Sequence, residues 1–272
     1  MTTSATPQRH TARQIGYRER AGLYAHEHCD TVDQPFLAGL ARAADGPVLE
    51  VPCGSGRNLR LLASTGSQVT GMDIEPEMAR AARRAVGATP DIQVVVGDMR
   101  SLRLRERQAL ILVPREAFQL LPAYADALRA LRRFADQLRP GGTVMLDLAT
   151  FADGAQDEQH LHPSYFDPGV RDTRLVHDWV RETADGQLER WHRQQQDPDA
   201  VTIGYCYEVR RAGGPVEASE AGIRLLRYPK EPLLALLAES GLRARTLLGD
   251  YEGRSYREGS PRLIVLATGA EA

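Results

Sequence analysis

Residues 47–56, Pro-Val-Leu-Glu-Val-Pro-Cys-Gly-Ser-Gly, decide the fold class of this chain. The apolar run over 47–51 predicts a short buried strand, and the glycines that follow predict a tight turn into a helix expected over 58–63. A strand that ends in glycines before a helix lets the backbone approach a bound molecule closely, because glycine has no Cβ. Such a motif also occurs in many ordinary loops, so the sequence around it decides its meaning.

Short apolar runs and amphipathic segments alternate after this turn. Strands are expected over 68–72, 92–96, 109–113 and 143–148, and helices over 78–86 and 124–138. This alternation is typical of a parallel sheet with helices on both faces and right-handed crossovers. Further helical patterns precede the turn, over 13–29 and around 36–40.

The pattern changes between residues 160 and 227. Four strand-like runs separated by turn signals predict an antiparallel sheet that is inserted after the fifth parallel strand. The chain then returns to a helix over 231–240 and to strands over 242–248 and 263–267. We therefore expect lid helices and a cofactor-binding core over 1–158, an inserted substrate-covering sheet over 159–227, and the completion of the core over 228–272.

Composition excludes several classes of protein. The formal net charge is −2, from 34 basic and 36 acidic residues, so nucleic acid is not the expected partner. The three cysteines form neither a disulfide framework nor a CxxC metal motif. The N-terminus lacks the apolar core of a signal peptide, and no apolar run approaches the ~20 residues that span a bilayer. A cytoplasmic, soluble protein without a metal is expected, as a monomer or small homo-oligomer.

Acidic residues follow the second and third strands. Asp73 comes about 20 residues after the glycine turn, where a carboxylate can accept hydrogen bonds from ribose hydroxyls. Asp98 follows the next strand and can accept a hydrogen bond from an adenine amine. Carboxyl ends of parallel strands meet at one edge of a sheet, so these groups should share one ligand. The alternative is that both carboxylates only cap helices.

The identity of the ligand depends on two further positions. A nicotinamide dinucleotide favours a third glycine for close helix packing, and this chain has Leu59 after the second glycine. Glu50, just before the turn, would repel a phosphate but could hold a cationic ammonium group. The sequence therefore favours a methionine-containing cofactor over a dinucleotide.

These motifs resemble those of class I S-adenosylmethionine-dependent methyltransferases of the small-molecule, secondary-metabolite branch. The resemblance is carried by residues 48–57, 71–78, 96–99 and 138–142. It implies S-adenosylmethionine as the cofactor and a Rossmann-like α/β fold whose seven-stranded, mostly parallel sheet has the order 3-2-1-4-5-7-6, with strand 7 antiparallel. The cofactor residues that it implies are Glu50, Pro52, Gly54, Gly56, Asp73, Ile74, Met78, Asp98, Met99 and Val113. Pro52 replaces the usual glycine and removes one N–H donor.

The methyl acceptor is expected beyond the fourth parallel strand and beneath the N-terminal helices. Glu116 and Gln119 could orient it, although Glu116 could equally pair with an arginine. If residues 24–28 are helical, Tyr24, Glu27 and His28 share one face and could bind and deprotonate an acceptor. The alternative is an ordinary solvated face, and His26 and His28 diverge too far on a helix to share a metal.

Aromatic residues could complete the acceptor pocket. Phe118, Tyr165 and Trp179 are the candidates, with ordinary sheet packing as the alternative. The predicted function is methyl transfer to a nitrogen, oxygen or nucleophilic carbon of a small metabolite, such as an amine-bearing or indole-like compound. The alternatives are a cofactor-binding module without activity and a nucleic-acid methyltransferase. The latter would show Asn-Pro-Pro-Tyr after the fourth strand, where this chain has Val-Pro-Arg-Glu.

Overall fold

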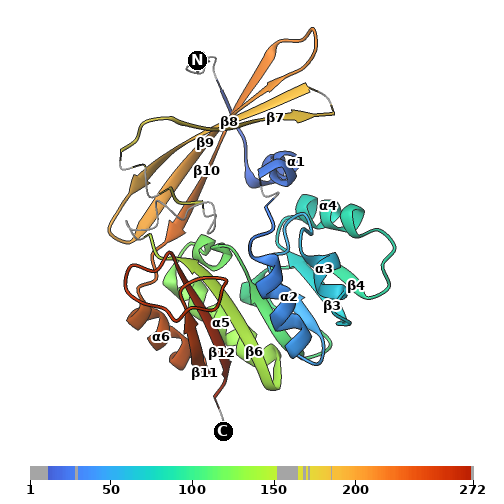
Figure 1. The fold of residues 1–272 in the computed structure, drawn as a ribbon, viewed down its shortest axis with the longest axis vertical. Helices are drawn as coiled ribbons and strands as arrows, with labels where there is room; N and C mark the ends of the chain where they lie inside the picture. The colour runs from blue at the N-terminus through green and yellow to red at the C-terminus, as the bar shows by residue number, and fades with distance from the viewer. Residues whose placement is uncertain are drawn as a thin grey trace.

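The computed structural model describes residues 12–27, 30–151, 165–167, 170, 172–184 and 186–270. They form an α/β body and a separate antiparallel sheet that stands on one edge of it (Figure 1). No helix among these residues has both the length and the apolar character needed to cross a bilayer. His28 lies outside the described residues.

The α/β body is built on a seven-stranded sheet with the order β11-β12-β6-β5-β2-β3-β4. β12 runs antiparallel to both of its neighbours, whereas the other pairs from β6 to β4 are parallel. The predicted order, 3-2-1-4-5-7-6, is therefore confirmed. The strands are β2 (Val48–Glu50), β3 (Val69–Asp73), β4 (Ile92–Val96), β5 (Gln108–Val113), β6 (Leu138–Ala149), β11 (Leu242–Leu248) and β12 (Arg262–Gly269).

Helices cover both faces of this sheet because its central strands are apolar on both sides. Along β5, Ile111 and Val113 pack into the cluster under helices α5 and α6, while Leu110 and Leu112 pack into the cluster under α2, α3 and α4. Burial on both faces is typical of parallel strands. The helices are α2 (Gln34–Ala43), α3 (Leu59–Ala63), α4 (Pro76–Val86), α5 (Tyr124–Gln137) and α6 (Lys230–Glu239), with short 3₁₀ turns η1 (Met99–Ser101) and η2 (Ala117–Leu120).

The second sheet has the order β1-β10-β9-β8-β7 and confirms the predicted antiparallel insertion after the fifth parallel strand. Its long strands are β7 (Val176–Thr183), β8 (Gly186–Gln196), β9 (Ala200–Arg210) and β10 (Val216–Leu226). The two-residue strand β1 (Arg13–Gln14) pairs in parallel with β10 and was not predicted.

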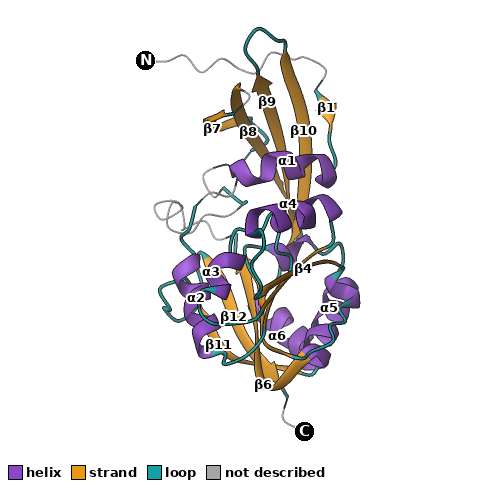
Figure 2. Cartoon of the chain, turned by 90° about the vertical axis from the view of Figure 1, so that its right-hand side faces the viewer, coloured by secondary structure: helices purple, strands orange, loops and turns teal. Residues whose placement is uncertain are grey.

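The N-terminal helix α1 (Tyr17–Glu27) lies between the inserted sheet and helix α4, in both views (Figures 1 and 2). Its main polar anchor is Glu27, whose carboxylate accepts hydrogen bonds from Arg20 of the same helix and from Tyr207 and Arg190 of the inserted sheet. Residues 13–27 therefore contact both the inserted sheet and helix α4 of the α/β core, with which the predicted division grouped them.

Candidate active site

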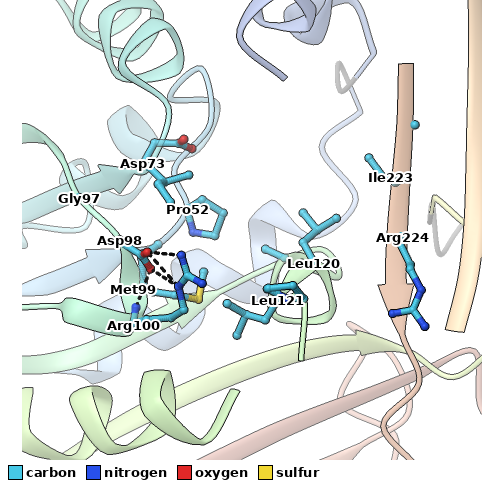
Figure 3. Close-up of a pocket in the computed structure, with 15 residues that line it drawn as sticks. Pro52, Asp73, Gly97, Asp98, Met99, Arg100, Leu120, Leu121, Ile223 and Arg224 are labelled. Carbon is cyan, nitrogen blue, oxygen red and sulfur yellow. Dashed lines mark hydrogen bonds and ion pairs between the residues drawn. The ribbon is translucent and has the colours of Figure 1, made fainter. Parts of the chain in front are cut away.

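A cavity of about 430 Å³ opens where the carboxyl ends of β2, β3 and β4 meet the inserted sheet. Pro52, Asp73 and Asp98 lie on one side of it, and Ile223 and Arg224 of β10 lie on the other (Figure 3). Leu120 and Leu121 lie between the two sides. The sequence predicts that the three strand ends hold a ligand. The cavity lies between these strand ends and strand β10 of the inserted sheet.

A smaller hollow of about 40 Å³ adjoins this cavity and shares Pro52, Ala117 and Leu120 with it. Glu50, Gly54 and the predicted acceptor residues Tyr24 and Tyr165 line it. The larger cavity is thus lined by Asp73 and Asp98, and the hollow by Glu50 and the cationic side chains Arg57 and Arg115.

Asp73 ends β3 with its carboxylate at the wall of the large cavity. Its two oxygens accept hydrogen bonds from the backbone N–H groups of Gly54 and Glu75, both at 2.9 Å. A carboxylate has about four lone-pair positions, so each oxygen can accept one more hydrogen bond, as two ribose hydroxyls require. Burial raises the pKa of Asp73, against the lowering effect of the two N–H groups. Glu75 is the residue that caps helix α4, so Asp73 is not merely its cap.

Ile74, Asp98 and Met99, which the sequence predicts to contact adenine, border one part of the large cavity. Ile74 is 55% exposed, which leaves an apolar surface beside the cavity. Asp98 accepts a hydrogen bond from the backbone N–H of Arg100 at 2.8 Å and so caps η1, as the alternative interpretation proposed. Its carboxylate also pairs with the Arg100 guanidinium, with Nη2 and Oδ2 2.6 Å apart. Hydrogen bonds from Arg100 hold the pKa of Asp98 below its usual range.

Glu50 is the buried acid of the glycine turn. Its Oε1 accepts a hydrogen bond from Asn58 Nδ2 at 2.7 Å, and its Oε2 is buried without a hydrogen-bond partner. Burial raises the pKa of Glu50 to about 8, and the hydrogen bond from Asn58 opposes this only in part. A buried acceptor with no partner is unfavourable, so Oε2 is suited to a donor that arrives with a ligand.

The two glycines of the turn serve different purposes. Gly54 has φ of +52°, and a Cβ there would lie 2.9 Å from Tyr24 Cε1 at the hollow. Gly56 has φ of +87°, and a Cβ there would lie 3.0 Å from Ala82 Cα of helix α4. Gly56 is therefore required for packing of the turn against α4, which corrects the prediction that its missing Cβ makes room for the ligand.

Glu116 does not face an acceptor. Its side chain is buried, and Oε1 accepts a hydrogen bond from Arg262 Nη2 at 2.6 Å, while Arg262 Nε donates to Asp147 Oδ1 at 2.5 Å. Burial raises the pKa of Glu116, and the charge of Arg262 opposes it. Glu116 lines neither cavity, so its predicted role as an acceptor ligand is corrected: it pairs with an arginine, as the alternative proposed.

Gln119 and Phe118 are also buried away from the cavities. The Gln119 amide donates to the carbonyls of Ala149 and Leu226 at 3.2 and 2.9 Å and accepts from the Ala149 N–H at 2.8 Å. These are the points where the chain leaves and re-enters the α/β body around the inserted sheet. Phe118 packs against Tyr228 with ring centroids 5.2 Å apart. Both residues are structural, which corrects their predicted contact with the substrate.

Of the predicted lid residues, Tyr24 reaches the hollow and Glu27 does not. The hydroxyls of Tyr24 and Tyr165 lie 3.5 Å apart, and both side chains line the hollow. Glu27 is buried in ion pairs with Arg20 and Arg190, at 2.5 and 3.2 Å. This pairing corrects the prediction that Glu27 deprotonates the acceptor, because its charge is already balanced by two cations.

Three other predicted residues lie outside the cavities. Met78 and Val113 are fully buried, Met78 in helix α4 and Val113 in the apolar core under α5 and α6. Trp179 lies on β7, and the guanidinium carbons of Arg181 and Arg190 lie 4.3 and 5.0 Å from its ring centroid. The expected contacts of Met78 and Val113 with the cofactor, and of Trp179 with the substrate, are therefore corrected.

Some residues that line the cavities were not predicted. Arg57, Asn58, Arg100 and Arg115 directly follow or adjoin predicted motifs, so their neighbourhood in the sequence could have identified them. Residues 222–224 of β10 carry no local signal, because only the return of the inserted sheet over the strand ends places them there. Among the described residues, no group of three His, Cys, Asp or Glu side chains is arranged to hold a metal ion.

Comparison with known proteins decides between the candidate ligands. A family profile described as "Methyltransferase domain" matches residues 48–142, which span the glycine turn, Asp73 and Asp98. Residues 48–142 are therefore a methyltransferase domain, and its motifs together with the similarity of the chain to curated methyltransferases support a class I S-adenosylmethionine-dependent enzyme. The cofactor of this methyltransferase is S-adenosylmethionine, which agrees with the predicted sulfonium ligand and excludes the dinucleotide.

The methyltransferase is similar along most of its length to two bacterial enzymes. It is 26% identical to the dTDP-3-amino-3,6-dideoxy-alpha-D-glucopyranose N,N-dimethyltransferase of Streptomyces fradiae, over 86% of this chain and 84% of that protein. It is 25% identical to the dTDP-4-amino-2,3,4,6-tetradeoxy-D-glucose N,N-dimethyltransferase of Saccharopolyspora spinosa, over 88% of this chain and 94% of that protein. The fold is shared with the sugar N-methyltransferase KedS8 from Streptoalloteichus sp ATCC 53650, with a TM-score of 0.71, 21% identity, and 100% and 99% of the two chains covered.

The residues of the methyltransferase fit the cofactor. Glu50 Oε2, buried and without a partner, is suited to the ammonium group, and the missing Cβ of Gly54 leaves space at the hollow. Asp73 has lone pairs left for the ribose hydroxyls, and Ile74 offers an apolar surface to a purine. These four residues would hold the cofactor with its methionine end in the hollow and its adenosine end in the large cavity.

Cofactor binding should depend on pH through Glu50. Glu50 is mostly protonated at pH 7, because its pKa is raised to about 8, and it must lose this proton to pair with the ammonium group. Binding at pH 7 should therefore release about one proton, and affinity should rise by up to about tenfold per pH unit between pH 6 and 7.5. Isothermal titration calorimetry in two buffers with different ionisation enthalpies measures this release. Glu50→Gln should bind more weakly and without the release; an equal release from that variant would contradict the assignment.

Proposed function

We propose that this methyltransferase transfers a methyl group from S-adenosylmethionine to the amino nitrogen of a small metabolite, with an amino sugar as the favoured acceptor. The proposal rests on which side chains line the place where the two cavities meet. There, Pro52, Ala117 and Leu120 present apolar surface, and the hydroxyls of Tyr24 and Tyr165 are among the polar groups that line the adjoining hollow. An uncharged amine is already a nucleophile and needs no strong base before it attacks.

The names of the relatives support an amine on a deoxygenated sugar. The enzymes of Streptomyces fradiae and Saccharopolyspora spinosa are N,N-dimethyltransferases of dTDP-linked amino deoxysugars. An apolar wall of Leu120, Leu121 and Ile223 suits a ring that has lost hydroxyl groups. Arg224, which pairs with the exposed Asp199 at 3.2 Å, lies on the inserted-sheet side and suits a phosphate. A nucleoside diphosphate carrying an amino sugar satisfies all three features.

The side chains of this chain would act by position and not by strong acid–base chemistry. When bound, S-adenosylmethionine supplies a methyl group activated by its sulfonium. An attacking amine must keep its lone pair directed at that methyl group, so it should donate N–H to the protein. The Tyr24 and Tyr165 hydroxyls can accept such a hydrogen bond, because one hydroxyl of the pair can donate to the other. Burial raises the pKa of Tyr165, so its hydroxyl keeps its proton at neutral pH. Orientation and exclusion of water then lower the barrier.

An acceptor screen by mass spectrometry tests the proposed function. The protein and S-adenosylmethionine are incubated with dTDP-linked amino deoxysugars, with the matching hydroxyl sugars, with unlinked amino sugars and with phenols. We expect one or two methyl groups on the amino sugar nucleotide and none on its hydroxyl counterpart. Methylation of oxygen alone, or binding of the cofactor with no turnover on any amine, would reject the proposal; the latter result would indicate a non-catalytic binding module.

A further inference from the structure

Two arginine–aspartate pairs border the hollow beside Glu50. Arg57 donates to both oxygens of Asp33, at 2.7 and 2.5 Å, and Arg115 donates to both oxygens of Asp30, at 2.9 Å each. Both guanidinium groups belong to residues that line the hollow. Bidentate pairs of this kind are among the stronger polar contacts in proteins.

The charges of the cofactor explain why cations beside Glu50 matter. The ammonium and carboxylate groups of S-adenosylmethionine are attached to the same carbon atom. If Glu50 Oε2 receives the ammonium, the carboxylate must lie close by, within the same hollow. Arg57 and Arg115 are the two cationic side chains among the described residues that line this hollow. One of them is therefore expected to meet the carboxylate.

The two pairs differ in what it would take to open them. The Asp33 side chain is 0% exposed, so removing Arg57 from it would leave a buried charge without compensation, which is strongly unfavourable. The Asp30 side chain is 32% exposed, so it can turn to water when Arg115 leaves it. Arg115 itself is anchored through its backbone N–H, which donates to Asp147 Oδ2 at 2.9 Å. Its side chain can change partner while its backbone stays in place.

We propose that Arg115 binds the carboxylate of S-adenosylmethionine by exchanging Asp30 for it. Asp30 then competes with the cofactor carboxylate for Arg115. Arg57 stays paired with Asp33 and lines the hollow without changing partner. The exchange keeps one carboxylate on Arg115 before and after binding, so no charge is stranded in the protein. The proposal concerns the cofactor only and does not depend on the identity of the acceptor.

Decarboxylated S-adenosylmethionine is the probe that isolates this contact. It keeps the sulfonium, the amine and the adenosine but lacks the carboxylate. Titration calorimetry at pH 8 with both compounds should show that the wild-type protein binds S-adenosylmethionine about tenfold to a hundredfold more tightly than the decarboxylated form, the range expected for hydrogen bonds between charged groups. Arg115→Gln should lose this preference while its affinity for the decarboxylated form changes little. Arg115→Lys, which keeps the charge without the bidentate geometry, should retain part of it.

Asp30→Asn provides the opposite change at the same contact. Removing the competitor should tighten the binding of S-adenosylmethionine severalfold and leave the decarboxylated form unaffected, and this variant leaves the arginine in place. The matched control combines Arg57→Gln with Asp33→Asn, so that no buried carboxylate is left without a cation, and it should keep the preference between the two compounds. The proposal is overturned if Arg115→Gln weakens both compounds by the same factor, if the variant Arg57→Gln with Asp33→Asn is the one that erases the preference, or if Asp30→Asn weakens the binding of S-adenosylmethionine.

Discussion

Asp73→Ala is expected to weaken the binding of S-adenosylmethionine by about a hundredfold or more. The carboxylate offers both remaining acceptor positions to the ribose hydroxyls, and each hydrogen bond to a charged group contributes about 1.5–3 kcal/mol. The substitution also removes the acceptor of the Gly54 N–H, so the turn that shapes the hollow loses its attachment to β3. Titration calorimetry measures the loss directly, without requiring the acceptor.

Two further variants make this result specific. Asp73→Asn keeps the shape of the side chain but replaces one acceptor oxygen with a donor, so it should lose a large part of the affinity. Asp91→Ala alters a residue just before β4, at the opposite end of the sheet, where Asp91 accepts a hydrogen bond from Gln68 at 2.6 Å. Asp91→Ala should bind normally. Normal binding by Asp73→Ala would mean that the cofactor site lies elsewhere.

The largest loss of stability is expected for Arg262→Met. Arg262 is fully buried between Asp147 and Glu116, with its guanidinium 5.1 Å from the ring centroid of Tyr251. Methionine replaces the aliphatic part of the arginine side chain but carries no charge, so the substitution leaves two carboxylates buried without a cation. Breaking a buried pair in this way costs about 3–5 kcal/mol in the free energy of unfolding. Denaturant unfolding followed by circular dichroism measures the change.

The same unfolding experiment can show whether the loss of stability comes from the two unpaired carboxylates or from the lost packing of the arginine side chain. If stranded charge is the cause, a triple variant that adds Asp147→Asn and Glu116→Gln to Arg262→Met should recover part of the lost stability. Arg132→Met is the control, because Arg132 and its ion-pair partner Glu239 are both largely exposed, and its unfolding midpoint should match the wild type. A triple variant less stable than Arg262→Met alone would refute this explanation.

The cofactor half of the site could be predicted from the sequence because its signals are local. Strand ends, glycines and acidic residues follow one another within residues 48–99, and apolar periodicity fixes the strands that carry them. The strand order came from the family resemblance. The structure keeps Glu50, Pro52, Gly54, Asp73 and Asp98 at one edge of the sheet. Met78 and Val113 lie in the same segments but face the core, because a motif alone does not show which way each side chain points.

The acceptor half was harder to predict because its contacts join distant parts of the chain. Glu116 pairs with Arg262, 146 residues away, and Gln119 bonds to Leu226, 107 residues away. Glu27 meets Tyr207 and Arg190 of the inserted sheet. In each case the charge or the hydrogen-bonding groups of a predicted site residue are already paired, and the partner is one that the sequence did not indicate. The two-residue strand β1 is too short to show any periodicity at all.

The most direct test of the account is a crystal structure of the protein with S-adenosylhomocysteine, the product form of the cofactor. We expect the ribose hydroxyls to lie on the Asp73 carboxylate, the ammonium on Glu50 and the adenine against Ile74. Density for the nucleoside in any other cavity, or an amino-acid end that points away from Glu50, would contradict it.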